Sequence, residues 1–300
     1  MIEFQSLTLE QADTVTGLLQ CAGERGCEYS FANLYLWGRQ KAAIHQGNLA
    51  LFSQFNRKSV YPFPLGKDVA ATLDAIIHDA AARGIPCRIT GLLAADCQIL
   101  EALYPGRFRF HQDRDSWDYI YDINDLADLK GRKYQKKRNH INRFYQDHPE
   151  VRWEPIDEAN LDIVTRLVAA WYEKRQAAVP GSDFHMEKAA IKKALANRRA
   201  LKMEGLLLYV NEEPTAMTMG SRLSEKTFDV HFEKAILEDA YPVINQLFAR
   251  YLRQAHPELC WLNREEDMGL EGLRKAKLSY CPHHMVEKSW ACLLEDGCEY

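Results

Sequence analysis

The chain has 300 residues, of which 47% are hydrophobic and 27% are charged, and its formal net charge is −4. This composition excludes an intrinsically disordered chain, and the small negative charge excludes a protein that is basic over its whole surface. Two hydrophobic cores are expected, because single cores stop growing near ~250–300 residues. The first residues lack a secretion signal, and no apolar run approaches the ~20 residues of a membrane helix, so we expect a soluble, cytoplasmic protein without a transmembrane segment.

The eight cysteines are irregularly spaced and include no CxxC pair. We expect reduced and mostly packed thiols, as is usual inside the cell. Cys281, His283 and His284 could suggest a metal, but no second pair of ligands stands at zinc-site spacing. The sequence therefore predicts no metal site.

Helical and strand periodicities alternate through residues 1–129. The predicted elements are helices at 9–19 and 27–37, a strand meander over 43–62, a helix at 68–82, a strand at 87–90, a helix at 94–103, and a pair of strands at 108–111 and 117–121. This order predicts an N-terminal lobe built on one mixed sheet with helices against it.

A basic segment, 130–150, links this lobe to residues 151–300, which repeat its element order. The predicted elements are a strand at 151–155, a helix from 161 and another at 186–195, a three-strand meander over 205–233, a helix at 243–252, a strand at 258–263, a short helix at 270–276 and a final strand at 285–291. We therefore expect an α+β protein with two lobes, 1–129 and 151–300, joined by a basic helix.

The loop before the helix at 243–252 is informative about cofactors. A three-strand meander, a long helix and then strand–helix–strand is the element order of the GNAT-type N-acetyltransferase fold. In that fold, glycines in this loop expose backbone N–H groups that bind the pyrophosphate of coenzyme A. Residues 234–245 contain no glycine and place Glu238 and Asp239 at the phosphate position, where they would repel it. We therefore expect no coenzyme A.

Three segments extend the resemblance over nearly the whole chain: CEYSFANLYLW at 27–37, GRKYQKKRNHINRF at 131–144 and NREEDMGLEGLR at 263–274. They resemble the DUF2156 family, which includes the C-terminal domain of phosphatidylglycerol lysyltransferases and is related to the FemABX aminoacyltransferases. The resemblance implies tandem GNAT-like lobes and transfer of an aminoacyl group from aminoacyl-tRNA to a lipid headgroup or a small amine. The sequence departs from the lipid enzymes in that we expect no counterpart of their membrane-spanning part.

Three polar residues, Asp229, His231 and Glu233, alternate along one predicted strand, so their side chains should share a face. In acyl transfer a base takes a proton from the attacking amine or hydroxyl, and His or Glu can do so. These three residues are the catalytic candidates, with His231 or Glu233 as the proton acceptor. Polar residues exposed on a sheet surface are the alternative interpretation.

The substrate-binding candidates follow the next predicted strand and continue into the helix after it: Asn263, Glu265, Glu266, Asp267, Arg274, Lys275 and Lys277. The carboxylates could hold the ammonium of an aminoacyl group, although an acidic loop is the alternative. For the three basic residues, the resemblance implies contact with the donor's terminal adenosine or a phosphate. A helix C-terminus favours cations in any case.

The basic segment supplies the candidates for binding nucleic acid or phosphate: Lys133, Lys136, Lys137, Arg138, Asn139, His140, Asn142 and Arg143. Clustered Lys and Arg provide most non-specific affinity for tRNA or for an anionic headgroup. A solvated amphipathic helix between the lobes is the alternative. Two further functions stay open: a non-catalytic protein that binds tRNA or anions, and a coenzyme A-dependent N-acetyltransferase with an atypical loop.

Overall fold

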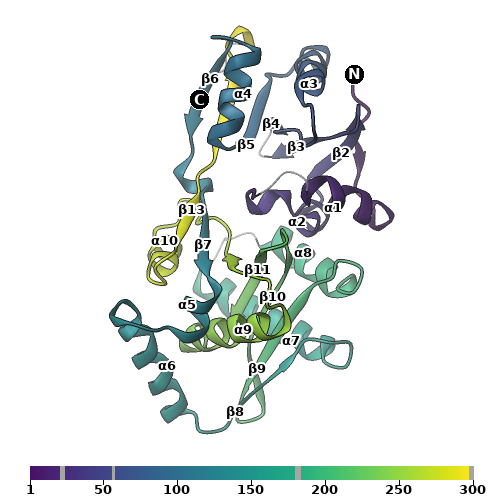
Figure 1. Cartoon of the computed structure of the whole chain (residues 1–300). Helices are drawn as coiled ribbons and strands as arrows, with labels where there is room; N and C mark the ends of the chain where they lie inside the picture. Colours follow the sequence, from purple (N-terminus) through teal and green to yellow (C-terminus); the bar gives the residue numbers. More distant parts are fainter. Residues whose placement is uncertain (21–23, 56–57, 180–183, 297–300) are drawn as a thin grey trace. The chain divides into compact units, whose positions relative to one another are not determined.

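The computed structural model describes residues 1–20, 24–55, 58–179 and 184–296 (Figure 1). The chain forms two compact units, each with its own seven-stranded sheet. The first unit comprises Met1–Asp118, Glu266–Glu271 and Met285–Tyr300, and the second comprises Tyr119–Glu265 and Gly272–His284. The described residues from Met285 onward therefore belong to the first unit.

The sheet of the first unit is mixed. Its strands, in spatial order, are β1 (Gln5–Ser6), β2 (Gln40–His45), β3 (Asn48–Phe55), β4 (Lys58–Pro62), β5 (Arg88–Leu92), β14 (Ser289–Leu293) and β6 (Phe108–Gln112). Four helices accompany them: α1 (Ala12–Gln20), α2 (Phe31–Trp37), α3 (Ala70–Arg83) and α4 (Ala94–Leu103). Leu73 and Ile76 of α3 pack in one buried cluster with Leu100 of α4 and Ile89 of β5, which gives this unit its core.

The sheet of the second unit is also mixed. Its strands, in spatial order, are β13 (His284–Val286), β7 (Asp118–Asp122), β12 (Trp261–Asn263), β11 (Thr227–Ala235), β10 (Glu213–Arg222), β9 (Glu204–Val210) and β8 (Val151–Pro155). Its helices are α5 (Ile123–Asp128), α6 (Gln135–Asp147), α7 (Leu161–Ala178), α8 (His185–Ala196), α9 (Tyr241–Ala255) and α10 (Glu271–Leu278).

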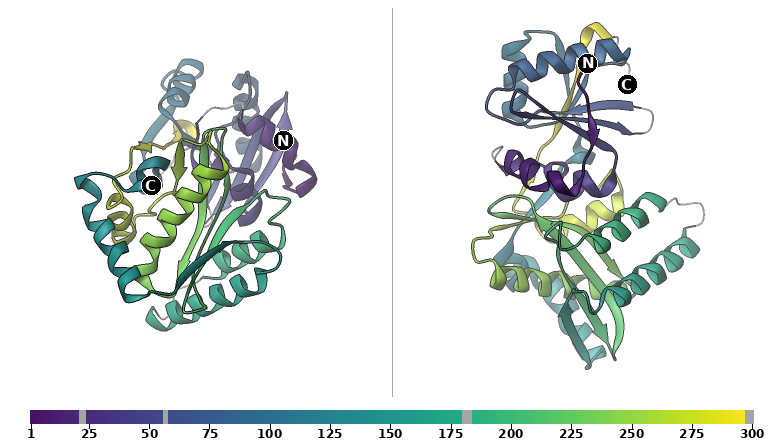
Figure 2. Two further views of the ribbon diagram at one scale, coloured as in Figure 1. Left: turned by 60° about the horizontal axis from the view of Figure 1, so that its bottom comes forward. Right: turned by 90° about the vertical axis from the view of Figure 1, so that its right-hand side faces the viewer.

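Helices cover both faces of the second sheet (Figure 2, left). Val243 and Ile244 of α9 pack against Ala235 of β11 in a buried apolar cluster. The adjacent residue of β11, Lys234, points the opposite way, and its Nζ lies 4.2 Å from the centre of the Trp171 ring on α7. Because successive side chains of a strand alternate between faces, α9 and α7 lie on opposite faces of the sheet.

Two strands join the sheet of the other half of the sequence, which corrects the predicted pairing. We expected 108–111 and 117–121 to pair with each other, but β6 lies in the first sheet and β7 pairs with β12 in the second. The final strand, predicted at 285–291 in the C-terminal lobe, is divided in the structure: β13 lies in the second sheet, whereas β14 pairs with β5 and β6 in the first. The sequence of a short apolar strand does not specify which distant strand it pairs with. Element order therefore could not show that β7 and β14 pair in the sheet of the other half of the sequence.

Among the helices that the structure describes, none is both long and apolar enough to cross a bilayer. The cysteines differ from the expectation in one respect. Cys27, Cys87, Cys97, Cys260 and Cys281 are reduced thiols, whereas Cys292 is disulfide-bonded. Spacing alone cannot show which Cβ atoms approach closely enough to be bridged. Cys21 and Cys298 lie outside the described residues.

Candidate active site

A β-bulge in β11 positions His231. In the pairing of β10 with β11, Met219 is opposite Phe232 and Gly220 is opposite Val230, so His231 is the extra residue. The two backbones approach closely here, and a Cβ added to Gly220 would collide with the carbonyl oxygen of Asp229. The bulge interrupts the strict alternation expected over 229–233, and it redirects the imidazole.

His231 lies at the centre of a buried polar array with Ser221, Asp229 and Glu265. Its Nε2 is 2.8 Å from Ser221 Oγ, and its Nδ1 is 3.1 Å from Glu265 Oε1 and 3.4 Å from Asp229 Oδ2. The His231 side chain is 1% exposed and that of Glu265 is 22% exposed, so Glu265 is the member that solvent reaches. The array can hold or move a proton between a hydroxyl, an imidazole and a carboxylate.

Glu233 lies apart from this array, in an ion pair with Arg264. Arg264 Nη2 donates to Glu233 Oε2 at 2.7 Å, and the Arg264 side chain is 9% exposed. Burial alone would lower the pKa of Arg264, but Glu233 raises it above its ordinary value. We did not single out Arg264 from the sequence, where it stands unmarked between Asn263 and Glu265.

The backbone after β12 is fixed by hydrogen bonds from the strand itself and from α10. Asn263 Oδ1 accepts the backbone N–H of Glu265 at 2.7 Å. From α10, Lys277 Nζ donates to the carbonyl oxygens of Arg264 and Glu265, at 2.5 and 3.0 Å. The predicted substrate residues Asn263 and Lys277 thus fix the backbone that carries Glu265. Of the other two basic candidates, Arg274 is half-buried and Lys275 is exposed.

Glu266 and Asp267 belong to the first unit and lie in other surroundings. Glu266 Oε2 is 3.2 Å from Cys27 Sγ. Asp267 is fully buried and accepts the backbone N–H of Gly269 at 2.9 Å, with Arg114 3.4 Å away. The four polar residues expected at one substrate site are therefore divided between two environments.

A buried lysine that the sequence analysis did not single out lies near Glu266. Lys288 Nζ is 2.7 Å from Asp118 and 2.8 Å from Glu28, with Glu266 at 3.8 Å. Burial alone would lower its pKa, but Asp118 and Glu28 raise the pKa of Lys288 well above the usual lysine value. These charges form one paired cluster inside the first unit.

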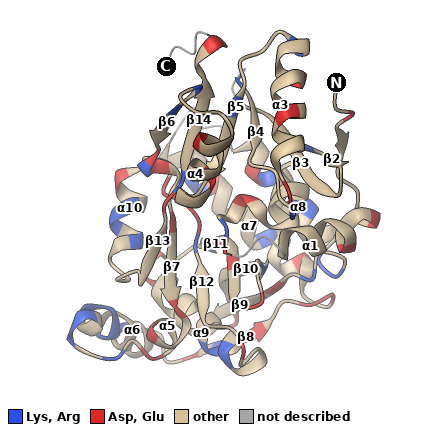
Figure 3. Cartoon of the chain, turned by 45° about the horizontal axis from the view of Figure 1, so that its top comes forward, with Lys and Arg blue, Asp and Glu red and all other residues tan. Residues whose placement is uncertain are grey.

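The basic segment forms α6 and the turn before it. Its apolar side packs into the second unit through Tyr134, Ile141 and Phe144, whereas Tyr145 is 41% exposed. Figure 3 shows the Lys and Arg residues gathered on this helix. The candidate side chains that are exposed in this segment are Lys133, Lys136, Asn139, His140, Asn142 and Arg143.

Several of these basic side chains already have partners. Lys133 pairs with Asp125 at 2.7 Å, and Arg143 pairs with Asp147 at 3.4 Å. Arg138 donates to the carbonyl oxygens of Leu129 and Gly131, so it closes the turn before α6. Pairing at an exposed site is weak, so Lys133 and Arg143 could exchange their partners for a ligand anion.

Lys137 turns away from the exposed side of α6. Its Nζ lies 3.7 Å from the centre of the Tyr280 ring, and the side chain is half-buried. Burial, with a smaller contribution from the nearby Arg264, lowers the pKa of Lys137 to about 8. A pKa so far below the ordinary value marks a functional-site candidate.

The loop at the predicted phosphate position forms a 3₁₀ turn, Glu238–Ala240, directly before α9. Pro242 stands in the first turn of α9. Proline has no N–H, so this helix start offers fewer backbone donors than the glycine-rich loop of the coenzyme A enzymes.

Two groups of potential metal ligands lie within the described part of the chain: Cys27, Asp118 and Glu266, and Asp229, His231 and Glu265. In the first group the ammonium of Lys288 already neutralises Asp118. In the second group both ring nitrogens of His231 are hydrogen-bonded. His283 and His284 do meet, with their Nδ1 atoms 2.9 Å apart.

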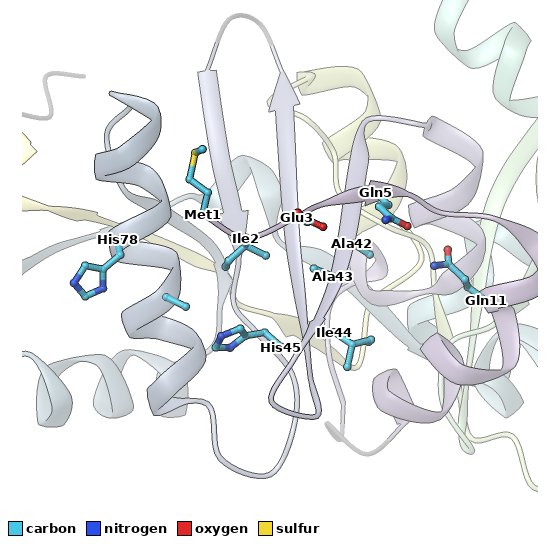
Figure 4. A pocket seen from close by; sticks show the side chains of 11 residues that line it. Met1, Ile2, Glu3, Gln5, Gln11, Ala42, Ala43, Ile44, His45 and His78 are labelled. Atoms are coloured by element: carbon cyan, nitrogen blue, oxygen red, sulfur yellow. The ribbon is translucent and has the colours of Figure 1, made fainter.

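Neither of two surface hollows contains a predicted site residue. One, of about 590 Å³, lies in the first unit between the N-terminal residues, β2 and α3 (Figure 4). The other, of about 610 Å³, lies in the second unit and is lined by α7 and α8.

Comparison with known proteins shows that the chain matches one protein family over most of its length. A family model described as "Phosphatidylglycerol lysyltransferase, C-terminal" matches residues 20–292. A conserved protein of unknown function from Bacteroides thetaiotaomicron superposes with a TM-score of 0.91 and 37% identity, over 98% of this chain and all of the other.

More distant structures share the fold. The L-PGS of Bacillus licheniformis superposes with a TM-score of 0.66 and 15% identity, over 96% of this chain and 93% of the other. FemX superposes with a TM-score of 0.60 and 12% identity, over 99% of this chain and 98% of the other. An uncharacterized protein of Mycoplasmoides gallisepticum is 24% identical over 177 residues, and the match covers 58% of this chain and 55% of that relative's length. The predicted fold, two mixed sheets flanked by helices as in the GNAT-like and Fem-type proteins, is confirmed.

Proposed function

The chain belongs to the phosphatidylglycerol lysyltransferase C-terminal family, and from that premise we propose that it transfers an aminoacyl group from aminoacyl-tRNA. The acceptor is a lipid headgroup or a small amine. The observation that carries the proposal is the Ser221–His231–Glu265 array, in which a hydrogen-bonded imidazole stands behind a partly exposed carboxylate.

The chemistry assigned to this array is general base catalysis. The hydroxyl oxygen or amine nitrogen of the acceptor attacks the ester carbonyl of the aminoacyl-tRNA, and the ester bond to the terminal ribose breaks. Glu265, as the exposed member, takes the proton of the nucleophile, and His231 shares it through the 3.1 Å contact. The same proton returns to the departing ribose oxygen, so no external acid is needed.

Binding of the donor is assigned to the exposed side of α6. Lys133, Lys136 and Arg143 present cations there, and clustered cations supply the salt-dependent part of nucleic-acid affinity. Coenzyme A is not part of the proposal, since Glu238 and Asp239 occupy the turn before α9. Acetyl-CoA should therefore leave the melting temperature unchanged, whereas a ligand at 100 times its Kd would add about 2.7 kcal/mol of stability.

The direct test is transfer in vitro. Purified protein is incubated with a tRNA pool charged with labelled amino acids and with phosphatidylglycerol vesicles or a panel of small amines. Labelled acceptor should form with the wild-type chain and should fall by about a hundredfold or more with Glu265→Gln. Equal product from Glu265→Gln would remove Glu265 from the mechanism, and the absence of product with every acceptor would contradict the proposal.

The burial of His231 favours one second candidate, a non-catalytic protein that binds tRNA or anions. On that account the array only stabilises the bulge. Two variants discriminate between the accounts when tRNA binding and transfer are both measured. Lys136→Ala should weaken tRNA binding on either account, whereas Glu265→Gln should abolish transfer on the catalytic account and change nothing measurable on the other.

A further inference from the structure

Two cations in the second unit, Lys137 and Arg264, lie against the same aromatic ring. Lys137 Nζ is 3.7 Å from the centre of the Tyr280 ring, and the Cζ atom of Arg264 is 4.7 Å from it. They reach this ring from α6 and from the end of β12, respectively. Like charges repel, so two cations at one ring cost free energy unless an anion joins them.

Arg264 is incompletely satisfied. Its Nη2 pairs with Glu233, but Nε and Nη1 are buried without a hydrogen-bond partner. The side chain is 9% exposed, so solvent does not replace the missing contacts. A buried donor without a partner is costly, more so for a charged group, and such groups are rare in native proteins without a functional reason.

The neighbourhood has an excess of positive charge. The carboxylate of Glu233 compensates one of the two cations, and Tyr280 and Asn245 complete the cluster with neutral groups. Asn245 Oδ1 is a third buried atom without a partner. The cluster thus lacks one anionic group with several oxygens, at least one of which could also donate a hydrogen bond.

We propose that Lys137, Arg264 and Tyr280 form a binding site for one phosphate group of a small molecule. A phosphate offers oxygens to both cations at once, and a protonated phosphate oxygen could donate to Asn245. A carboxylate has fewer oxygens to share between two cations. The burial of Arg264 favours a single small phosphate over a nucleic-acid backbone. A nucleic-acid backbone would instead contact the exposed side chains of α6.

The site does not depend on the proposed transfer, and its test needs no charged tRNA. Binding of inorganic phosphate and of glycerol 3-phosphate to the full chain is measured by calorimetry, with Lys137→Gln, Lys137→Arg and Lys130→Gln. Lys130 is a matched control because it is 83% exposed, pairs with Asp128 and lies outside the cluster. Separate arms measure sedimentation with phosphatidylglycerol vesicles and with phosphatidylcholine vesicles, and the binding of uncharged tRNA.

We expect Lys137→Gln to weaken phosphate binding about tenfold or more, Lys137→Arg to restore most of it, and Lys130→Gln to bind like the wild-type chain. Loss of phosphatidylglycerol sedimentation in Lys137→Gln would identify a lipid headgroup as the source, and binding of the free phosphates alone would identify a soluble one. The proposal is overturned if neither phosphate binds the wild-type chain, if Lys137→Gln binds as tightly, or if tRNA alone depends on Lys137. Failure of transfer with intact phosphate binding would count against the proposed function only.

Discussion

Ser221 Oγ lies 2.8 Å from His231 Nε2, on the opposite side of the imidazole from Glu265. Both ring nitrogens are therefore engaged, and the ring is fixed in one orientation inside the second sheet. Such an arrangement lets the imidazole share a proton with the carboxylate without moving. The proposed catalysis requires this orientation of the ring and the bulge that produces it.

His231→Gln should lower the rate of transfer by about 10²–10⁴-fold while leaving tRNA affinity within a factor of about two. The amide keeps the approximate size of the side chain but cannot take up a proton. The measurement is kcat with saturating charged tRNA. His78→Gln is the control, since His78 is exposed on α3 and contacts the Asp74 carbonyl oxygen of the same helix. Similar rates for the two variants would exclude a role for the imidazole in turnover.

Gly220→Ala should destabilise the protein by about 1–3 kcal/mol, because its Cβ would collide with the carbonyl oxygen of Asp229 and the backbones would have to separate. Gly17→Ala is the matched control: nothing lies within 4 Å of its added Cβ, and it should gain about 0.5–1 kcal/mol in helix α1. Urea unfolding of both variants checks this. A Gly220→Ala protein as stable as Gly17→Ala would mean that the close approach at the bulge is not required.

Lys137→Met should make the protein more stable near pH 7. The folded-state pKa of Lys137 is lowered to about 8 from 10.5, so the unfolded chain binds the proton more tightly. Wild-type stability should then rise with pH between about 8 and 10.5, where the unfolded state carries more protons, and this part of the slope should vanish in the variant. Urea unfolding near neutral pH and near the upper end of that range measures the difference, with Lys130→Met as control. An identical pH slope in Lys137→Met would show that the pKa of the lysine is not lowered.

Lys288→Met should destabilise the first unit by about 3–5 kcal/mol, because it leaves the buried carboxylate of Asp118 without its cation. Adding Asp118→Asn should recover part of the loss, since the uncompensated charge is then removed. Thermal unfolding of the single and double variants gives the coupling between the two side chains. Lys130→Met, which breaks an exposed pair, should cost about 0–1 kcal/mol. Additive effects of Lys288→Met and Asp118→Asn would contradict the buried pair.

Local pattern was sufficient for most helices and for the meander of the second unit. The apolar spacing at 243–252 predicted α9, and the three-strand meander predicted over 205–233 is present as β9, β10 and β11. The exchange of β7 and β14 between sheets could not be predicted, because it depends on pairing between residues that are far apart in sequence, such as Ala291 with Ile89.

The candidate site was predictable only in part, because local pattern identifies polar residues on a strand but not their distant partners. Polar residues on a strand identified Asp229 and His231, but no spacing rule signals the bulge at His231 or the partner Ser221 on β10. Arg264 and Lys288 are single basic residues without a motif. Their burial, and hence their importance, follows only from the packed structure.

The central claim is that the second unit supports aminoacyl transfer through the His231–Glu265 pair. Its most direct test is a single-turnover reaction with labelled aminoacyl-tRNA, in which product and remaining ester are followed for the wild-type chain and for Glu265→Gln. We expect the label to pass to the acceptor with the wild-type chain and to stay on the tRNA with the variant, although both bind the donor. Bound aminoacyl-tRNA that the wild-type chain never discharges, with any acceptor in the panel, would contradict the account.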